Sequence, residues 1–274
     1  NNAVVSELSA DQMLKELSFG SWRVGDPGVQ YESLIQDMHT SKNSGRINSS
    51  NPCSEYMFLD DTACNLASLN LLAFRDLDGD FATDQYQHAI RLWTIVLEIS
   101  VLMAQFPSEE IAKNSYRYRT LGLGYANLGG LLMAAGLPYD SSEGRALAGA
   151  LTAVMTGTSY RTSAEMAEEL GTFPGFEDNS EAMLRVMRNH QRAAHGLVEG
   201  YEELTILPLP LDIENCPIPD LVETAQRAWD EAVEMGKHSG YRNAQATVIA
   251  PTGTIGLVMD CDTTGIEPDF ALVK

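Results

Sequence analysis

The sequence Ser50-Asn51-Pro52-Cys53-Ser54-Glu55 places an amide, a thiol and a carboxylate at alternate positions. Because alternate side chains of an extended segment point the same way, we expect Asn51, Cys53 and Glu55 to face one pocket. Pro52 disfavours the helical conformation for the residue before it, which favours an extended loop. A carboxylate can move a proton, an amide can orient a substrate, and a sulfur can carry a nucleophile or a radical. The alternative is a surface turn that begins at Asn-Pro and carries a packed cysteine.

A second stretch, near the other end of the chain, has the pattern of an anion site. Residues 244–250 are predicted to form a buried strand, and they lead into Pro251-Thr252-Gly253-Thr254-Ile255. A strand that feeds a glycine-containing turn and then a helix presents several backbone N–H groups to an anion. The sequence therefore predicts a phosphate site here, and a plain strand-to-helix turn is the alternative.

Together these stretches resemble the active-site region of the ribonucleotide reductase large chain. The first motif continues from residues 51–55 into Thr62-Ala63-Cys64-Asn65-Leu66-Ala67-Ser68-Leu69-Asn70-Leu71, and the second comprises residues 250–256 and 260–270. Residues 121–129, which we expect among the linking helices, are also similar to that family. The proline inside the first motif resembles the adenosylcobalamin-dependent class. The resemblance extends over essentially the whole chain.

The resemblance implies an α/β fold that is helix-rich and forms part of a ten-stranded α/β barrel. The barrel would be built from two half-sheets, with Cys53 on a finger loop at its centre, short strands inside and helices outside. Residues 1–274 would form one partial catalytic barrel domain. The chain begins without Met and ends in the apolar run 270–274. We therefore expect an internal fragment of a longer reductase, incomplete at both ends.

The implied reaction is reduction of ribonucleotides to 2'-deoxyribonucleotides by a thiyl radical that adenosylcobalamin initiates. Radical chemistry generated by a cofactor avoids a step that is hard by polar chemistry. By resemblance, Cys53 carries the radical that abstracts the 3'-hydrogen, Glu55 takes the 3'-hydroxyl proton, and Asn51 holds the substrate. The residues implied to bind the substrate are Ser50, Asn51, Cys53, Ser54, Glu55, Pro251, Thr252, Gly253, Thr254 and Ile255.

The resemblance also assigns a redox role to Cys64. It matches one member of the cysteine pair that becomes a disulfide while the substrate is reduced. The other member is expected upstream of Asn1, and neither Cys216 nor Cys261 matches it. We therefore expect the fragment alone to be inactive.

The partners implied are a ribonucleotide and an external dithiol reductant such as thioredoxin. A nucleotide effector would bind outside residues 1–274, and a homodimer is left open. Two alternatives remain: a class I large subunit, which works with a separate radical-generating subunit, and a non-catalytic helical scaffold or regulatory remnant.

Composition narrows the class of protein. The net charge of −20 argues against a nucleic-acid partner or an anionic membrane surface, since both need a basic field. No apolar run is long enough to span a membrane, and we expect a cytoplasmic protein. The four cysteines have no CxxC spacing, so neither a disulfide scaffold nor a zinc site is expected. Asp60-Asp61 is read as part of a solvated loop rather than a metal pair.

Hydrophobic periodicity predicts the regular elements. Residues 65–74 fit a strand or a helix equally well, and residues 116–119 are predicted to form a strand. The glycines at 122, 124 and 129 do not have dinucleotide-binding spacing, and the small residues Ala126, Gly129, Gly130 and Ala134 are expected to let helices pack closely. The helix over 84–106 is apolar around much of its circumference and is expected to be largely buried. The helices are expected over residues 9–17, 29–38, 84–106, 141–170, 177–195 and 219–238.

Overall fold

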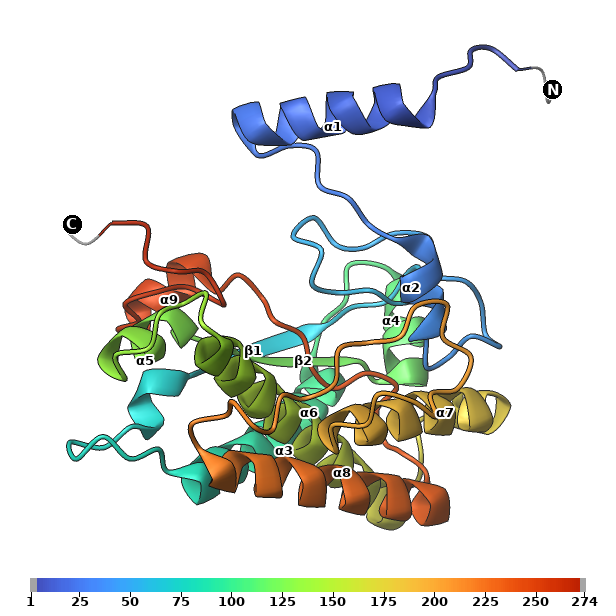
Figure 1. The fold of residues 1–274 in the computed structure, drawn as a ribbon. Helices are drawn as coiled ribbons and strands as arrows, with labels where there is room; N and C mark the ends of the chain where they lie inside the picture. The colour runs from blue at the N-terminus through green and yellow to red at the C-terminus, as the bar shows by residue number, and fades with distance from the viewer. Residues whose placement is uncertain (1–3, 272–274) are drawn as a thin grey trace.

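Two parallel strands form the centre of the computed structural model, which describes residues 4–271 (Figure 1). Strand β1 (Asn65–Asn70) pairs with β2 (Leu121–Ala126) from Asn65↔Leu121 to Asn70↔Ala126. The open choice between strand and helix for residues 65–74 therefore resolves as strand β1 followed by a short 3-10 helix, η1 (Leu71–Phe74).

The segment that was predicted as a strand over 244–250 lies along the free edge of β2. Leu121 and Leu123 donate backbone hydrogen bonds to Gln245 and Ala246, and Val248 donates one back to Leu123. Only the Leu123↔Thr247 bridge has strand geometry. The prediction is thus right about position and extension but wrong about a regular strand.

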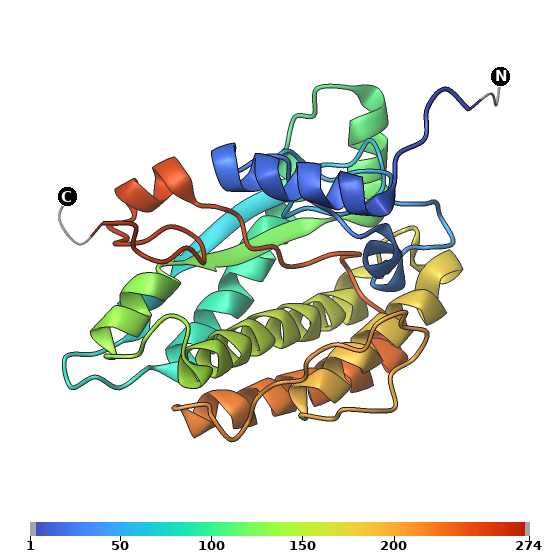
Figure 2. The ribbon, with the colours of Figure 1, turned by 45° about the horizontal axis from the view of Figure 1, so that its top comes forward.

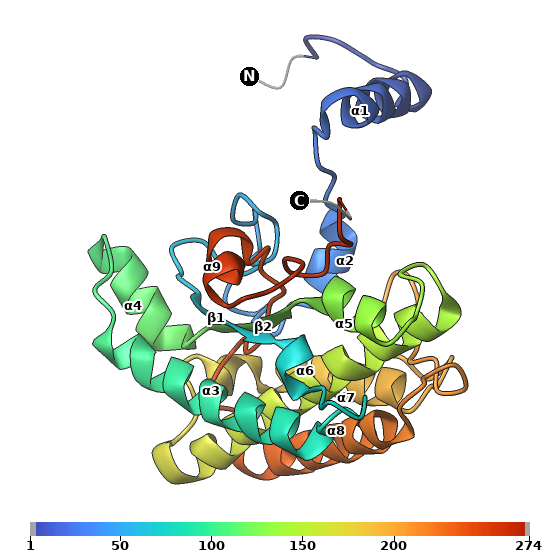
Figure 3. The same cartoon turned by 90° about the vertical axis from the view of Figure 1, so that its left-hand side faces the viewer.

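One side of the strands is covered by a layer of long helices, as Figure 3 shows. Helix α3 contacts both strands and α6, and α8 packs against α6 and α7. Figure 2 shows α6 running the length of the body beside α8. The bounds are α3 (Thr83–Met103), α6 (Ser142–Leu170), α7 (Phe176–Ala194) and α8 (Pro219–Ser239).

Shorter elements occupy the rim and the opposite side of the strands (Figure 3). None of the residues of α1 is buried, and Figure 1 shows this helix standing apart from the body. The bounds are α1 (Ala10–Val24), α2 (Glu32–Asp37), α4 (Glu109–Tyr118), α5 (Leu128–Ala134) and α9 (Gly253–Val258).

Serine side chains mark the starts of α1 and α6, and a glycine marks the end of α6, but α1 runs to Val24, seven residues beyond its expected end at residue 17. Ser9 caps α1 by accepting a hydrogen bond from Gln12 N–H, and Ser141 caps α6 by accepting one from Gly144 N–H. Gly171 ends α6 with a positive φ of 80°. These local contacts fix helix ends without reference to the rest of the fold.

Three predictions about elements were wrong. Residues 116–119, predicted as a strand, are the end of α4 and its left-handed cap at Arg119. Residues 121–129 hold strand β2 and the start of α5 rather than helices alone. Helix α3 lies where expected, but one face is exposed: Trp93 is 43% exposed, Ile99 52% and Met103 77%.

The strands do not close into a barrel within residues 4–271. What the described chain shows is a helix-rich α/β unit with one parallel strand pair and an extended segment along its edge. The long helices lie on one side of the strands, and the shorter ones lie at the rim and on the other side (Figure 3).

Candidate active site

Residues 51–54 form a tight turn, so the expected extended segment is wrong. Ser54 N–H donates to Asn51 O at 3.1 Å, and Ser54 has a φ of 65°. Pro52 occupies the second position of the turn, where its fixed φ is favoured, and this outweighs its preference for extended chain before it. The turn leaves the Cys53 thiol exposed.

Asn51 and Tyr56 close the base of this turn. Asn51 N–H donates to Tyr56 O at 3.3 Å, and Tyr56 N–H donates to Asn51 Oδ1 at 3.0 Å. A bridge between Ser50 and Met57 lies just outside them. The amide oxygen of Asn51 therefore shapes the loop.

Glu55 and Cys64 lie close together behind the turn. Burial raises the pKa of the Cys64 thiol to about 12, and the nearby Glu55 charge adds to the effect. Glu55 Oε2 is buried and has no hydrogen-bond partner among the residues that the structure describes. An unpaired buried carboxylate oxygen is costly in a fold, which makes Glu55 a candidate for a chemical role.

Glu55 also lines a cavity of about 320 Å³ that contains two histidines. Burial lowers the pKa of His39 and of His190 to about 4, so both rings are neutral near pH 7. His39 accepts a hydrogen bond from Ser41 N–H at 3.2 Å, which requires that Nδ1 carries no proton. Neither histidine therefore supplies a positive charge to the Glu55 carboxylate.

The space for the Cys64 sulfur comes from the neighbouring strand. A Cβ atom built on Gly122 would collide with Cys64 Sγ and would lie 2.6 Å from Leu66 Cδ2 and 3.0 Å from Val248 Cγ2. The first two contacts are shorter than real Cβ contacts, so any larger residue here would force the neighbouring side chains to shift. Gly122 thus allows side chains to pack closely against strand β2.

The predicted phosphate loop lies at the other end of β1. Thr252 is buried in a left-handed conformation, and its Oγ1 lies 2.9 Å from Ser68 Oγ. Gly253, Thr254 and Ile255 follow it at the exposed start of α9. The first N–H groups of any helix have no partner within the helix, so those at this loop are open to an acceptor.

Cys64 and Ser68 lie on the same face of the chain. Their separation of four residues is even, and successive side chains of a strand alternate between faces. Ala67 and Leu69, on the other face, pack into the core with the helices. With about 3.3 Å of rise per residue, the two ends of this site lie roughly 13 Å apart along β1.

Two residues with roles in the site were missed in the sequence. Gln30 Nε2 donates to Ser50 Oγ at 2.6 Å and to Ser54 Oγ at 2.9 Å, which ties both serines of the turn together. Asn127 Oδ1 accepts from the N–H groups of Asp262 and Thr263, at 3.1 Å each, and so fixes the segment after α9. Asn127 lies between a strand and a helix and has a φ of 69°, a left-handed conformation that asparagine tolerates. The signal in the sequence was an asparagine at the junction of the two elements.

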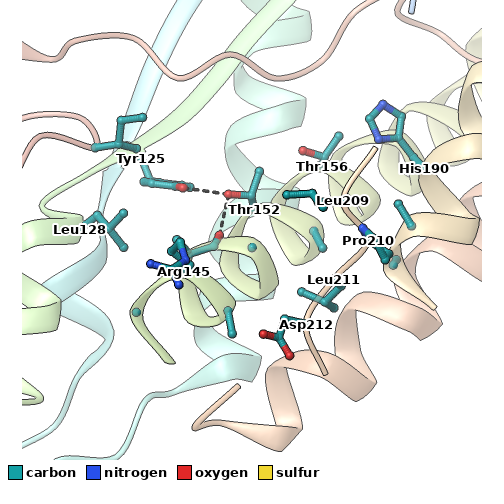
Figure 4. A pocket seen from close by; sticks show the side chains of 18 of the residues that line it. Tyr125, Leu128, Arg145, Thr152, Thr156, His190, Leu209, Pro210, Leu211 and Asp212 are labelled. Carbon is teal, nitrogen blue, oxygen red and sulfur yellow. Dashed lines mark hydrogen bonds between the residues drawn. The ribbon is translucent and has the colours of Figure 1, made fainter. Parts of the chain in front are cut away.

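A larger cavity, of about 750 Å³, shares Thr156 and His190 with the smaller one and is lined by none of the predicted site residues. Figure 4 shows it between Tyr125, whose hydroxyl lies 2.8 Å from Thr152 Oγ1, and the connector that carries Leu209 to Asp212. Its walls are mostly apolar. The larger of the two cavities therefore does not mark the position of the thiols and the carboxylate.

Residues 4–271 contain no cluster of three or more His, Cys, Asp or Glu side chains that could hold a metal ion. Within the same residues, no helix has the length and apolar character needed to cross a membrane.

Comparison with known proteins identifies the family. The family described as ribonucleotide reductase, barrel domain, matches residues 1–274, and the chain belongs to it. The vitamin B12-dependent ribonucleotide reductase of Bradyrhizobium diazoefficiens is 64% identical over 272 residues, which cover 99% of this chain and 22% of the relative. That of Rhodopirellula baltica is 51% identical over 265 residues, covering 97% and 24%.

A more distant relative has a more specific name. The vitamin B12-dependent ribonucleoside-diphosphate reductase of Mycobacterium tuberculosis is 29% identical over 272 residues, covering 98% of this chain and 31% of the relative. The chain thus spans between 22% and 31% of the length of these three proteins.

Proposed function

We propose that the full-length protein containing this chain reduces ribonucleotides to 2'-deoxyribonucleotides by a thiyl-radical mechanism that depends on adenosylcobalamin. One observation carries the proposal: an exposed thiol, Cys53, sits on a turn directly before Glu55, whose unpaired carboxylate oxygen lies beside a second thiol, Cys64. The names of the relatives support the dependence on vitamin B12.

The residues of the turn fit a bulky radical-generating cofactor, because the Cys53 thiol is exposed at the tip of the loop. When bound, adenosylcobalamin would supply the homolytic bond cleavage by which the Cys53 thiol loses a hydrogen atom. The Cys53 sulfur, having lost its hydrogen, takes the 3'-hydrogen of the ribose. The Glu55 carboxylate takes the 3'-hydroxyl proton, and the Asn51 side chain holds the sugar by hydrogen bonds.

Cys64 is proposed to supply reducing equivalents. Loss of water from C2' and its replacement by hydrogen consumes two electrons, which a pair of thiols provides by forming one disulfide. The raised pKa of Cys64 keeps the group as a thiol, which carries both the electron and the proton that the step needs. Its partner cysteine lies outside residues 1–274, and an external dithiol such as thioredoxin restores the pair.

The loop of residues 251–255 is proposed to hold the phosphates of the substrate. Its exposed N–H groups and the hydroxyl pair of Ser68 and Thr252 lie on the same strand face as Cys64. A nucleotide is elongated, so its ribose can reach the thiols while its phosphates reach this loop. Gly253, Thr254 and Ile255 would contribute backbone N–H groups rather than side chains, and Pro251, which has no N–H, would shape the loop.

The finer features of the fold are proposals as well. The described strands and the turn at Cys53 support one part of a ten-stranded barrel with a central finger loop. A nucleotide effector would bind outside this chain, and a homodimer is compatible with it. The class I alternative, with a separate radical-generating subunit, is not favoured, because the relatives named above depend on vitamin B12.

The experiment uses the full-length protein under anaerobic conditions with a ribonucleotide and a dithiol. Formation of deoxynucleotide is measured with and without adenosylcobalamin, for wild type, Cys53→Ala and the control Cys261→Ala. We expect activity that needs both the cofactor and Cys53 and that survives the change at Cys261. Activity without the cofactor would move the protein to class I, and an active Cys53→Ala variant would refute the proposal.

A further inference from the structure

Tyr56 makes contacts with both halves of the candidate site. Its backbone groups bond to Asn51 at the base of the Cys53 turn, as described above. Its hydroxyl lies 2.9 Å from Thr62 Oγ1 and 3.0 Å from Thr120 Oγ1. Thr62 precedes Cys64 by two residues, and Thr120 directly precedes β2.

The two threonines in turn hold the backbone that leads to Cys64. Thr62 Oγ1 donates to Leu59 O at 2.5 Å, and Thr120 Oγ1 donates to Ala63 O at 2.6 Å. On its other side Ala63 N–H donates to Ser115 Oγ at 3.1 Å. Ala63, the residue before Cys64, is therefore held at both its N–H and its C=O.

The chemistry of the Tyr56 hydroxyl suits a fixed donor. Burial raises its pKa well above the usual range, so it keeps its proton at any pH at which the protein works. Both threonine hydroxyls donate their protons to carbonyl groups. The phenol of Tyr56 is therefore the donor in its contacts with the two threonine oxygens. Tyr56 thus completes a hydroxyl network that neither threonine could complete alone.

We propose that Tyr56 is a positioning residue that holds Cys64 in register with Glu55 and the Cys53 turn. The inference rests on the proposed function for its chemical meaning, since the register matters only if the two thiols act on one substrate. The contacts through which Tyr56 holds the chain before Cys64 do not depend on that function. Without the phenol hydroxyl, the chain at residues 62–63 loses one tie to the turn, and the Cys64 thiol loses its fixed place between Glu55 and Gly122.

The test uses the full-length protein and the chemical reactivity of one thiol. The variant Tyr56→Phe keeps the ring and removes only the hydroxyl. The matched control is Tyr241→Phe, which removes a buried phenol that donates to Ala232 O at 2.9 Å in the helical layer. Alkylation of Cys64 by iodoacetamide at mildly alkaline pH is followed by mass spectrometry, with Cys53 as an internal reference.

We expect Cys64 to react about fivefold faster in Tyr56→Phe, equivalent to one net hydrogen bond of about 1 kcal/mol. Tyr241→Phe should leave the rate within about twofold of wild type, since it changes no contact near the thiol. Thr120→Val, which removes the second hydroxyl of the network, should act in the same direction. In turnover assays the Tyr56→Phe change should lower kcat and leave KM nearly unchanged.

Two results would overturn the inference. One is a Cys64 alkylation rate in both Tyr56→Phe and Thr120→Val that matches wild type. The other is an equal acceleration in Tyr241→Phe, which would indicate general loosening. A protein that lacks reductase activity but shows the expected change at Cys64 would refute the proposed function and leave the positioning role standing.

Discussion

The two ends of the β1 face that carries Cys64 and Ser68 are built in opposite ways. At the Cys64 end, side chains fill the space: Glu55 lies behind the thiol, the Tyr56 hydroxyl network fixes its backbone, and Gly122 leaves just enough room for its sulfur. At the Ser68 end, the loop after Thr252 is exposed, and a Cβ built on Gly253 meets nothing within 4 Å. The first end depends on side-chain chemistry and close packing, whereas the second depends on backbone groups.

The largest effect is expected from Glu55→Gln, which tests the chemistry of the closed end. Removal of a general base lowers turnover by about 10²–10⁴-fold, so deoxynucleotide formation by the full-length protein should fall within that range. The exposed Glu110→Gln serves as the control. A loss smaller than about tenfold would contradict the role of Glu55 as the base.

The same variant has a second readout at Cys64. Because the Glu55 charge contributes to the raised pKa of that thiol, its removal should lower the pKa of Cys64 from about 12, while burial still keeps it above the ordinary value of 9.0. Since the thiolate is the reactive form, alkylation of Cys64 should begin at a lower pH than in wild type. An unchanged pH profile would show that the two groups do not interact.

A glycine pair compares the two ends directly. Gly122→Ala puts a methyl group against Cys64 and Leu66, and overpacking of this kind costs about 1–3 kcal/mol of stability. Gly253→Ala adds the same methyl group in open space at the start of α9 and should change stability by less than about 0.5 kcal/mol. Urea unfolding of the two variants measures both values.

Activity should follow the same division between the ends. Gly122→Ala displaces the Cys64 sulfur and should lower kcat, whereas Gly253→Ala leaves the thiols in place. Equal destabilisation by the two alanines would mean that the crowding at Gly122 relaxes at no cost. That result would mean that the Cys64 end of the strand is not packed more tightly than the Ser68 end.

Helix positions could be predicted because their signals are local, although the first helix runs to Val24 rather than to residue 17. Ser141 and Gly171 delimit α6 through contacts within the helix itself. The exposed face of α3 could not be predicted, since an apolar residue such as Trp93 or Ile99 carries no information about which surface covers it. The run before Arg119 was read as a strand from alternation over four residues, a length too short to separate the two periods.

In the candidate site, too, local sequence signals do not predict which single contacts form. The sequence identified Cys53, Glu55 and Cys64 through a resemblance, yet the expected extended geometry around Cys53 is a turn. The tie between Tyr56 and Thr120 joins residues 64 positions apart. Such long-range hydrogen bonds follow from the fold and leave no mark in local spacing.

The smallest effect is expected from Ser68→Ala, which tests the open end. The change removes the 2.9 Å contact with Thr252 Oγ1, and a net hydrogen bond of about 0.5–1.5 kcal/mol corresponds to an increase in KM of roughly two- to twelvefold. The thiols lie at the far end of the strand, so kcat should hold. Steady-state kinetics with the full-length protein measures both constants.

Ser100→Ala provides a matched control for this last prediction, because Ser100 Oγ accepts a hydrogen bond from Asn65 Nδ2 at 2.7 Å and so anchors β1 at its other end. It removes an anchor of the same strand without touching the Thr252 loop. If Ser68→Ala raises KM and Ser100→Ala does not, the effect belongs to the loop and not to the strand as a whole. A fall in kcat with constant KM would instead place Ser68 with the thiols, and the two ends would then work as one site.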